Sequence, residues 1–268
     1  MEQSDTTTRQ FAEVLAREPA MSADVHRRAQ AASGGAGGAG GAGGDHRHGS
    51  LAEALTTLDD RARREVLATV LADHLLVVPG RTDITDRLRT RGAAVGIIGQ
   101  IIAEQHSLPR DEGWTAGLFH DVGWTVGYGV LRGTRFRASM PEPPSPVLQE
   151  AILHRAHAQL AAIVFDAWQV PVVCADGVAG HHNPDAQANG AALASRLFLA
   201  CRVADRLGIF PEAPESAGER ALPVFRGGGR ELATIGRRAW PRLRAHGLVS
   251  EPKRQSRPIV GPERRSAA

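Results

Sequence analysis

Apolar residues recur every three or four positions along most of this chain, and this spacing constrains the fold more than any other feature of the sequence. Such spacing places apolar side chains along one face of an α-helix. After residue 50 the pattern runs through Leu51, Leu55, Leu58, Ala62, Val66, Val70 and Val78. Aromatic residues make up only 4% of the chain, which leaves little of the β-branched and aromatic alternation that strands need. We predict an all-α fold.

Turn and cap signals divide this pattern into separate helices. Pro79-Gly80, Pro109 and Asn183-Pro184 end helical stretches, and Ser145-Pro146 begins one. The predicted helices span about 51–78, 84–105, 111–130, 145–168, 172–182, 188–207 and 230–246, with a further possible helix at about 8–32. Gly92, Gly96 and Gly99 lie on one face of the second, where we expect a neighbouring helix to approach closely.

The sequence suggests three parts. Residues 1–50 are predicted to be a flexible N-terminal region, because the Gly/Ala run at 34–44 has no side chains with which to bury a core. Residues 51–210 are predicted to form one helical domain. Residues 211–268 are a Pro/Arg-rich C-terminal extension that we expect to be partly disordered. The expected architecture is a helical bundle with flexible N- and C-terminal tails.

Charge and cysteine usage limit the partners and the compartment. The formal net charge is +3, and the basic run Arg237, Arg238, Arg242 and Arg244 is typical of a solvated helix face, so we do not expect nucleic acid as a partner. No apolar run approaches the ~20 residues of a membrane-spanning helix, and the N-terminus has no apolar leader segment, so we expect no membrane partner. Both cysteines, at 174 and 201, lie within apolar helical patterns and fit free thiols in a reducing cytoplasm.

His120 and Asp121 lie in the middle of an otherwise apolar predicted helix. An ionised carboxylate is costly to bury unless it is paired, hydrogen-bonded or bound to a cation. By itself the dipeptide also fits a core histidine beside a capped or exposed aspartate. The pair therefore indicates a metal site only together with other residues.

Four further polar residues follow on three later predicted helices. His157 and Asp205 lie on apolar helix faces, although a neighbouring arginine could pair with the aspartate. His181 and His182 end a helix, whose last carbonyls could instead stabilise a histidinium cation.

A helical bundle can bring such side chains to one centre, where imidazole and carboxylate groups suit a divalent metal such as Fe, Mn, Zn or Mg. The candidate metal ligands are His120, Asp121, His157, His181, His182 and Asp205.

Five short segments then carry a resemblance. In chain order they are residues 116–123 (AGLFHDVG), 157–162 (HAQLAA), 168–171 (WQVP), 181–184 (HHNP) and 203–205 (VAD). Together they resemble the motifs of the HDOD domain family of the HD superfamily, which is related to HD-GYP domains. The resemblance implies an HD-domain-like helical bundle. It also implies two metal positions, the first held by Asp121, His157, His181 and His182 and the second by His120 and Asp205.

Arg91 departs from the HD enzyme pattern. HD enzymes place a further histidine ligand at this position, whereas a guanidinium stays protonated and cannot ligate a metal. HDOD proteins also usually have a helical half before the HD-like half, and residues 51–90 are too few to supply all of it. The chain is therefore identified as a divergent or reduced member of the family.

Two functions are compatible with this resemblance. The first is a regulatory or signalling module, non-catalytic or with a degenerate metal site, that binds protein partners of a signalling pathway or a nucleotide ligand and holds one ion or none. The alternative is a metal-dependent phosphohydrolase acting on a nucleotide or cyclic dinucleotide, with Asp121 as catalytic residue and Arg91 contacting phosphate. Di-iron oxygenation on the same fold would use similar ligands.

Overall fold

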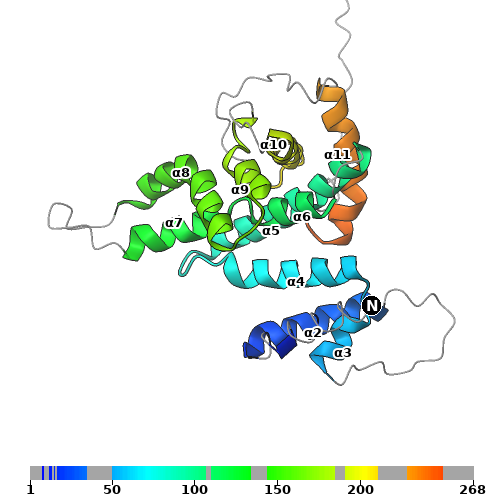
Figure 1. The fold of residues 1–268 in the computed structure, drawn as a ribbon. Helices are drawn as coiled ribbons and strands as arrows, with labels where there is room; N and C mark the ends of the chain where they lie inside the picture. The colour runs from blue at the N-terminus through cyan, green and yellow to red at the C-terminus, as the bar shows by residue number, and fades with distance from the viewer. Residues whose placement is uncertain are drawn as a thin grey trace, which may run out of the picture.

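The computed structural model describes residues 8, 12, 13, 15, 17–34, 50–106, 110–133, 144–184, 191–210 and 228–249. All regular elements within these ranges are α-helices, so the all-α prediction is confirmed (Figure 1). Most of the predicted Gly/Ala linker, from residue 35 to its end at 44, lies outside the described residues, as do residues 211–227 and 250–268 of the predicted C-terminal extension.

The helices follow one another along the chain as the cap and turn signals predict, with three exceptions. Their bounds are α2 (Pro19–Gly34), α3 (Leu51–Thr56), α4 (Asp60–Leu75), α5 (Thr82–Gln105), α6 (Arg110–Phe119), α7 (Val122–Gly133), α8 (Pro146–Ala167), α9 (Val172–Ala179), α10 (Ala191–Arg206) and α11 (Gly228–Ala245). The Ser145 hydroxyl accepts a hydrogen bond from the Leu148 N–H, which caps α8 as the Ser-Pro signal indicates.

Three segments predicted as single helices are each divided, and those predictions were wrong. The 8–32 segment is interrupted at Arg17 and Glu18, before α2 begins at Pro19. The 51–78 segment breaks where the Asp59 carboxylate accepts a hydrogen bond from the Ala62 N–H and starts α4 anew. The 111–130 segment breaks at His120-Asp121. There the Nδ1 atom of His120 lies 2.7 Å from the Gly117 carbonyl oxygen. In a continuous helix this carbonyl would accept a hydrogen bond from the Asp121 N–H.

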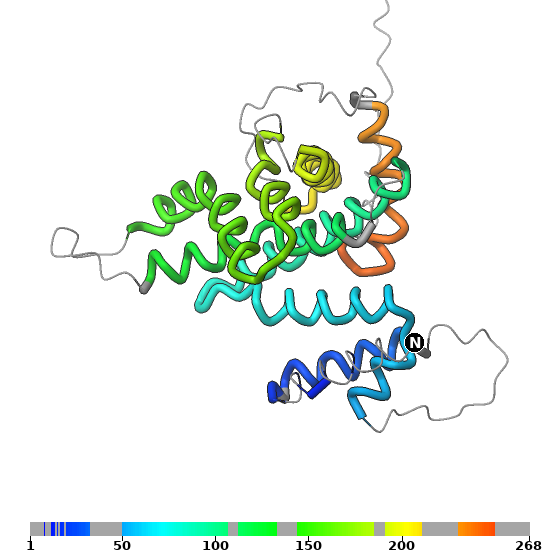
Figure 2. Tube along the Cα trace, in the orientation of Figure 1, coloured from blue at the N-terminus to red at the C-terminus, as the bar shows by residue number. Residues whose placement is uncertain are grey.

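Helix α4 lies between a small core and a large one, beneath the rest of the bundle in Figures 1 and 2. Val66 and Val70 of α4 pack in the small core with α2 and α3, whereas Ala72 belongs to the large core. We had placed the beginning of the helical domain at residue 51. In the structure α2, which precedes that boundary, packs against both α3 and α4.

Helices α5 and α6 pack with little space between their backbones. A Cβ atom added at Gly92 would collide with the Leu118 carbonyl oxygen, and one at Gly99 would lie 2.9 Å from the Gly113 carbonyl oxygen. The predicted close approach along the glycine face of α5 is therefore confirmed, and α6 is the helix that makes it. This packing fixes the end of α6, where the His120-Asp121 turn begins.

Two other sequence expectations concern membranes and thiols. None of the helices that the structure describes is both long and apolar enough to cross a membrane. Cys174 and Cys201 are buried free thiols in the large core, as their apolar surroundings in the sequence predict.

We expect the Gly92→Ala substitution to lower the free energy of unfolding by about 1–3 kcal/mol, because the added methyl group forces α5 and α6 apart. The matched control is Gly129→Ala in α7, where an added Cβ meets nothing within 4 Å. That change should raise stability by up to about 1 kcal/mol, since alanine favours the helix. Urea denaturation of both variants measures the difference. Equal changes in the free energy of unfolding for the two variants would contradict close packing of α5 and α6 at Gly92.

Candidate metal centre

Three elements bring five polar side chains to the centre of the large core. His120 and Asp121 come from the α6–α7 turn, and His157 from α8. His181 and His182 come from the turn that follows α9. His182 is exposed, while the other four residues are buried. The centre therefore has a buried side and a side open to solvent at His182.

The three buried imidazoles are oriented by backbone carbonyls. The Nδ1 atoms of His120, His157 and His181 lie 2.7, 2.9 and 2.6 Å from carbonyl oxygens three or four residues earlier in the chain. A neutral imidazole that donates from Nδ1 keeps its Nε2 lone pair for another partner. Hydrogen bonds from Nδ1 to a backbone carbonyl orient metal-ligating histidines in protein sites.

The imidazole Nε2 atoms and one carboxylate converge. His157 and His182 have their Nε2 atoms 2.9 Å apart, and the Nε2 atom of His157 lies 3.4 Å from Asp121 Oδ1. Ligand atoms of His157, His181 and His182 all lie within 4.8 Å of one another, as do those of His120, Asp121 and His181. The buried His181 Nε2 and Asp121 Oδ1 have no hydrogen-bond partner among the described residues. Such a donor set fits a metal ion.

Arg91 of α5 enters the same centre from the opposite side. Its Nη1 atom lies 2.8 Å from Asp205 Oδ1 of α10, and its Nε atom lies 3.7 Å from Asp121 Oδ2. Nη1 also donates to the Phe210 carbonyl oxygen at 3.1 Å. The Arg91 side chain is 2% exposed, so the guanidinium is a buried cation between two carboxylates.

The His120-Asp121 pair is also ionic in character. His120 Nε2 lies 3.1 Å from Asp121 Oδ2. Burial opposes charge on His120, but the attraction of Asp121 outweighs it and raises the pKa of His120 well above its usual value. Burial likewise opposes ionisation of Asp121, yet the neighbouring His120 cation lowers the pKa of this carboxyl well below its usual value.

His181 behaves in the opposite way. Its burial, reinforced by the neighbouring His182, lowers the pKa of His181 well below its usual value. The imidazole is therefore neutral near pH 7, which is the state that binds metal. The cationic groups Arg91 and His120 are then balanced by the anionic Asp121 and Asp205, so the charges in this centre cancel.

The structure divides the predicted ligand residues into two groups. It brings together His120, Asp121, His157, His181 and His182, whereas Asp205 belongs to neither ligand cluster and instead binds Arg91. Sequence reasoning missed the Gly117, Leu153 and Val178 carbonyls, and no sequence signal marks them, because every helical residue has a carbonyl three or four positions before it. It also left out His154, whose ring centroid lies 6.2 Å from those of His157 and His182.

The fold and this centre are those of an HD-type helical domain, and comparison with known proteins defines the family. The model of the HDOD domain matches residues 1–184, and the chain belongs to the HDOD family. The match begins at residue 1, so it includes α2 as well as residues 51–90. A search of curated proteins found no match.

Solved structures share the fold at low sequence identity. An HDOD domain protein of unknown function from Geobacter sulfurreducens is 17% identical, with a TM-score of 0.52, over 90% of this chain and 83% of its own. A proposed signal transduction protein from Marinobacter aquaeolei VT8 is 20% identical, with a TM-score of 0.56, over 89% of this chain and 54% of its own. A proposed metal-dependent phosphohydrolase from Shewanella amazonensis SB2B is 15% identical, with a TM-score of 0.53, over 88% of this chain and 76% of its own. These likenesses confirm the all-α HD-type fold.

We expect Arg91→Met to lower the free energy of unfolding by about 3 kcal/mol, because removing one partner of a buried ion pair leaves the other charge uncompensated. Arg202→Met is the matched control, since Arg202 Nη1 lies 3.7 Å from Asp205 Oδ2 but the Arg202 side chain is 36% exposed. That exposed pair should contribute less than about 1 kcal/mol. Chemical denaturation distinguishes the two. If the free energy of unfolding falls by the same small amount in both variants, Arg91 is not the main partner of Asp205.

Proposed function

We propose that this chain is an HDOD regulatory module whose HD-type centre no longer catalyses phosphate-ester hydrolysis. The observation that carries the proposal is the buried guanidinium of Arg91, which lies between Asp121 and Asp205. In this role the domain acts in the cytoplasm by binding protein partners of a signalling pathway or a nucleotide ligand. The Marinobacter neighbour, named for signal transduction, supports this direction.

The permanent charge of Arg91 opposes phosphate-ester hydrolysis at this centre. A two-metal site clamps the attacking and leaving oxygens of a phosphate ester between its ions. Arg91 occupies the space between the two carboxylates that a second ion would need, and its own charge is permanent. A divalent ion placed there would be repelled by the guanidinium and would have no ligand on α5. Two ions therefore cannot assemble around Asp121 and Asp205.

One ion still fits on the side away from Arg91. His157, His181 and His182 would hold it, with Asp121 Oδ1 as the nearest carboxylate oxygen. A donor set rich in imidazole suits zinc or iron better than magnesium. When bound, such an ion supplies positive charge for an anionic ligand and can lower the pKa of a bound water molecule. The exposed His182 lies where a ligand could approach from solvent.

A second candidate is a single-metal phosphohydrolase acting on a nucleotide or cyclic dinucleotide. The convergence of the histidines supports it, and the Shewanella neighbour is named for such an activity. Asp121 would then be the catalytic carboxylate. For Arg91 to contact phosphate, its guanidinium would have to release Asp205 and the Phe210 carbonyl. This rearrangement makes the phosphohydrolase the weaker of the two candidates.

The test is metal content together with activity, measured on the full chain purified without chelator and reconstituted with Zn²⁺, Fe²⁺ or Mn²⁺. We expect at most one ion per chain by elemental mass spectrometry, lost in His157→Ala and kept in His154→Ala. His154 is the matched control, because it lies beside the cluster but belongs to neither ligand group. No reconstituted form should hydrolyse cyclic dinucleotides or nucleotides.

Two results would overturn the regulatory assignment. One is a stoichiometry of two ions per chain. The other is turnover of a phosphate ester that disappears in Asp121→Ala, which would establish the phosphohydrolase instead.

A further inference from the structure

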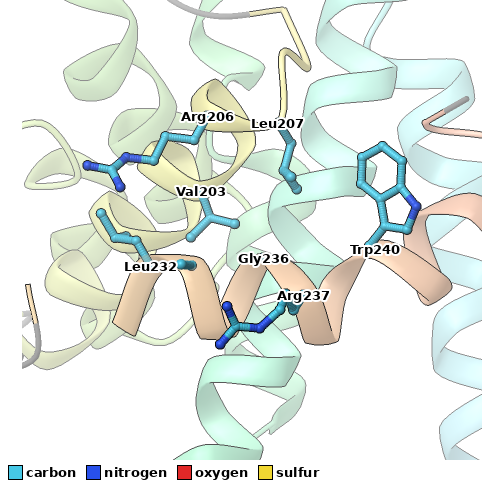
Figure 3. Close-up of a pocket in the computed structure, with 8 residues that line it drawn as sticks. Val203, Arg206, Leu207, Leu232, Gly236, Arg237 and Trp240 are labelled. Atoms are coloured by element: carbon cyan, nitrogen blue, oxygen red, sulfur yellow. The ribbon is translucent and has the colours of Figure 1, made fainter. Parts of the chain in front are cut away.

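The described bundle exposes apolar side chains on the outer side of α8 as well as in a groove between α10 and α11. The groove has Leu207 and Trp240 in its largely apolar lining (Figure 3). The exposed large apolar residues of α8 are Val147, Leu148, Ile152 and Ile163. On α8, charges of both signs accompany the apolar residues, and their order along the helix indicates what covers this surface.

One continuous stripe of exposed residues runs along α8. Residues three or four positions apart lie on the same face of a helix, and six exposed residues follow this spacing: Leu148, Ile152, Arg155, Gln159, Ile163 and Asp166. Its three apolar members are 48%, 39% and 64% exposed, in chain order. His157 lies on the opposite, buried face of α8. These six residues, here called the α8 stripe, therefore face away from the large core.

The two charges of the α8 stripe have no partner among the described residues. Neither the Arg155 guanidinium nor the Asp166 carboxylate forms an ion pair or a side-chain hydrogen bond with another described residue. By contrast, Glu150 of the same helix binds Arg81. Arg155 and Asp166 are separated by about 16 Å along the helix axis, so they cannot pair with each other. Each charge is free to pair with a group on another molecule.

We propose that the α8 stripe binds the α8 stripe of a second copy of this chain, with the two helices antiparallel and the two-fold axis near Gln159. About this axis, Arg155 lies within one helical turn of Asp166 of the partner subunit, and Ile152 lies within one turn of Ile163 of the partner subunit. Each contact occurs twice, as the symmetry of a two-fold dimer requires. A parallel pairing would instead place Arg155 against its own counterpart, and like charges oppose binding.

The size of this surface sets the expected affinity. Helix α8 has 22 residues, which makes it about 33 Å long and about 10 Å wide. A pair of such helices covers less area than the ~800 Å² per partner of a standard stable interface. We therefore expect a dimer that dissociates reversibly in the micromolar range. The interface is independent of the function proposed for the metal centre.

The test is analytical ultracentrifugation of the full chain at concentrations up to about 500 µM. We expect a reversible monomer–dimer equilibrium in the wild type. Arg155→Glu and Asp166→Arg should each raise the dimer dissociation constant about tenfold, because each turns two attractive contacts into repulsive ones. The combined Arg155→Glu/Asp166→Arg variant should restore the wild-type dissociation constant, because the paired charges are exchanged and remain opposite. Within one chain the two positions are too far apart for such a rescue.

An apolar variant tests the position of the interface. Ile163→Gln should also raise the dissociation constant about tenfold, since the apolar side chain that it removes is buried twice in the dimer. Leu75→Gln is the matched control, because Leu75 is an exposed apolar residue of α4, outside the α8 stripe, and its loss should leave dimerisation unchanged. A wild-type chain that stays monomeric over the whole range, a double charge variant as weak as the single ones, or unaltered dimerisation in Ile163→Gln would each overturn the proposal.

Discussion

Arg91 connects the parts of the large core that have to meet for the centre to exist. Its guanidinium joins α5 to Asp121 in the α6–α7 turn and to Asp205 on α10, and it binds the chain just after α10 through the Phe210 carbonyl. Buried charges are tolerated only when they are paired and hydrogen-bonded. The positions of the two carboxylates therefore depend on this one cation, whereas His120 contributes most to keeping Asp121 ionised.

The same cation decides what else the centre can bind. With Arg91 and the His120 imidazolium facing Asp121 and Asp205, the charges already cancel. A divalent ion is then favoured only on the far side, where the Nε2 atoms of His157 and His181 lie. We propose that this HD-type fold keeps part of its ligand set in this way without the paired ions that phosphate-ester chemistry uses.

Periodicity and turn signals predicted the helices and their order, because apolar spacing and caps are local properties of the sequence. They did not predict the break at His120, where the imidazole contacts the Gly117 carbonyl. The motifs predicted that six polar residues share one centre, and the structure brings five of them together. They did not show that Asp205 pairs with Arg91, because residues 114 positions apart meet only through tertiary packing.

The most direct test of the role of Arg91 is the number of divalent ions bound by the wild type and by Arg91→His, measured by Mn²⁺ titration of the full chain. If the guanidinium occupies the position of a second ion, the histidine variant should bind one more ion per chain than the wild type, since a cation is removed and an imidazole ligand is added. Equal stoichiometry in a folded Arg91→His variant would contradict this account.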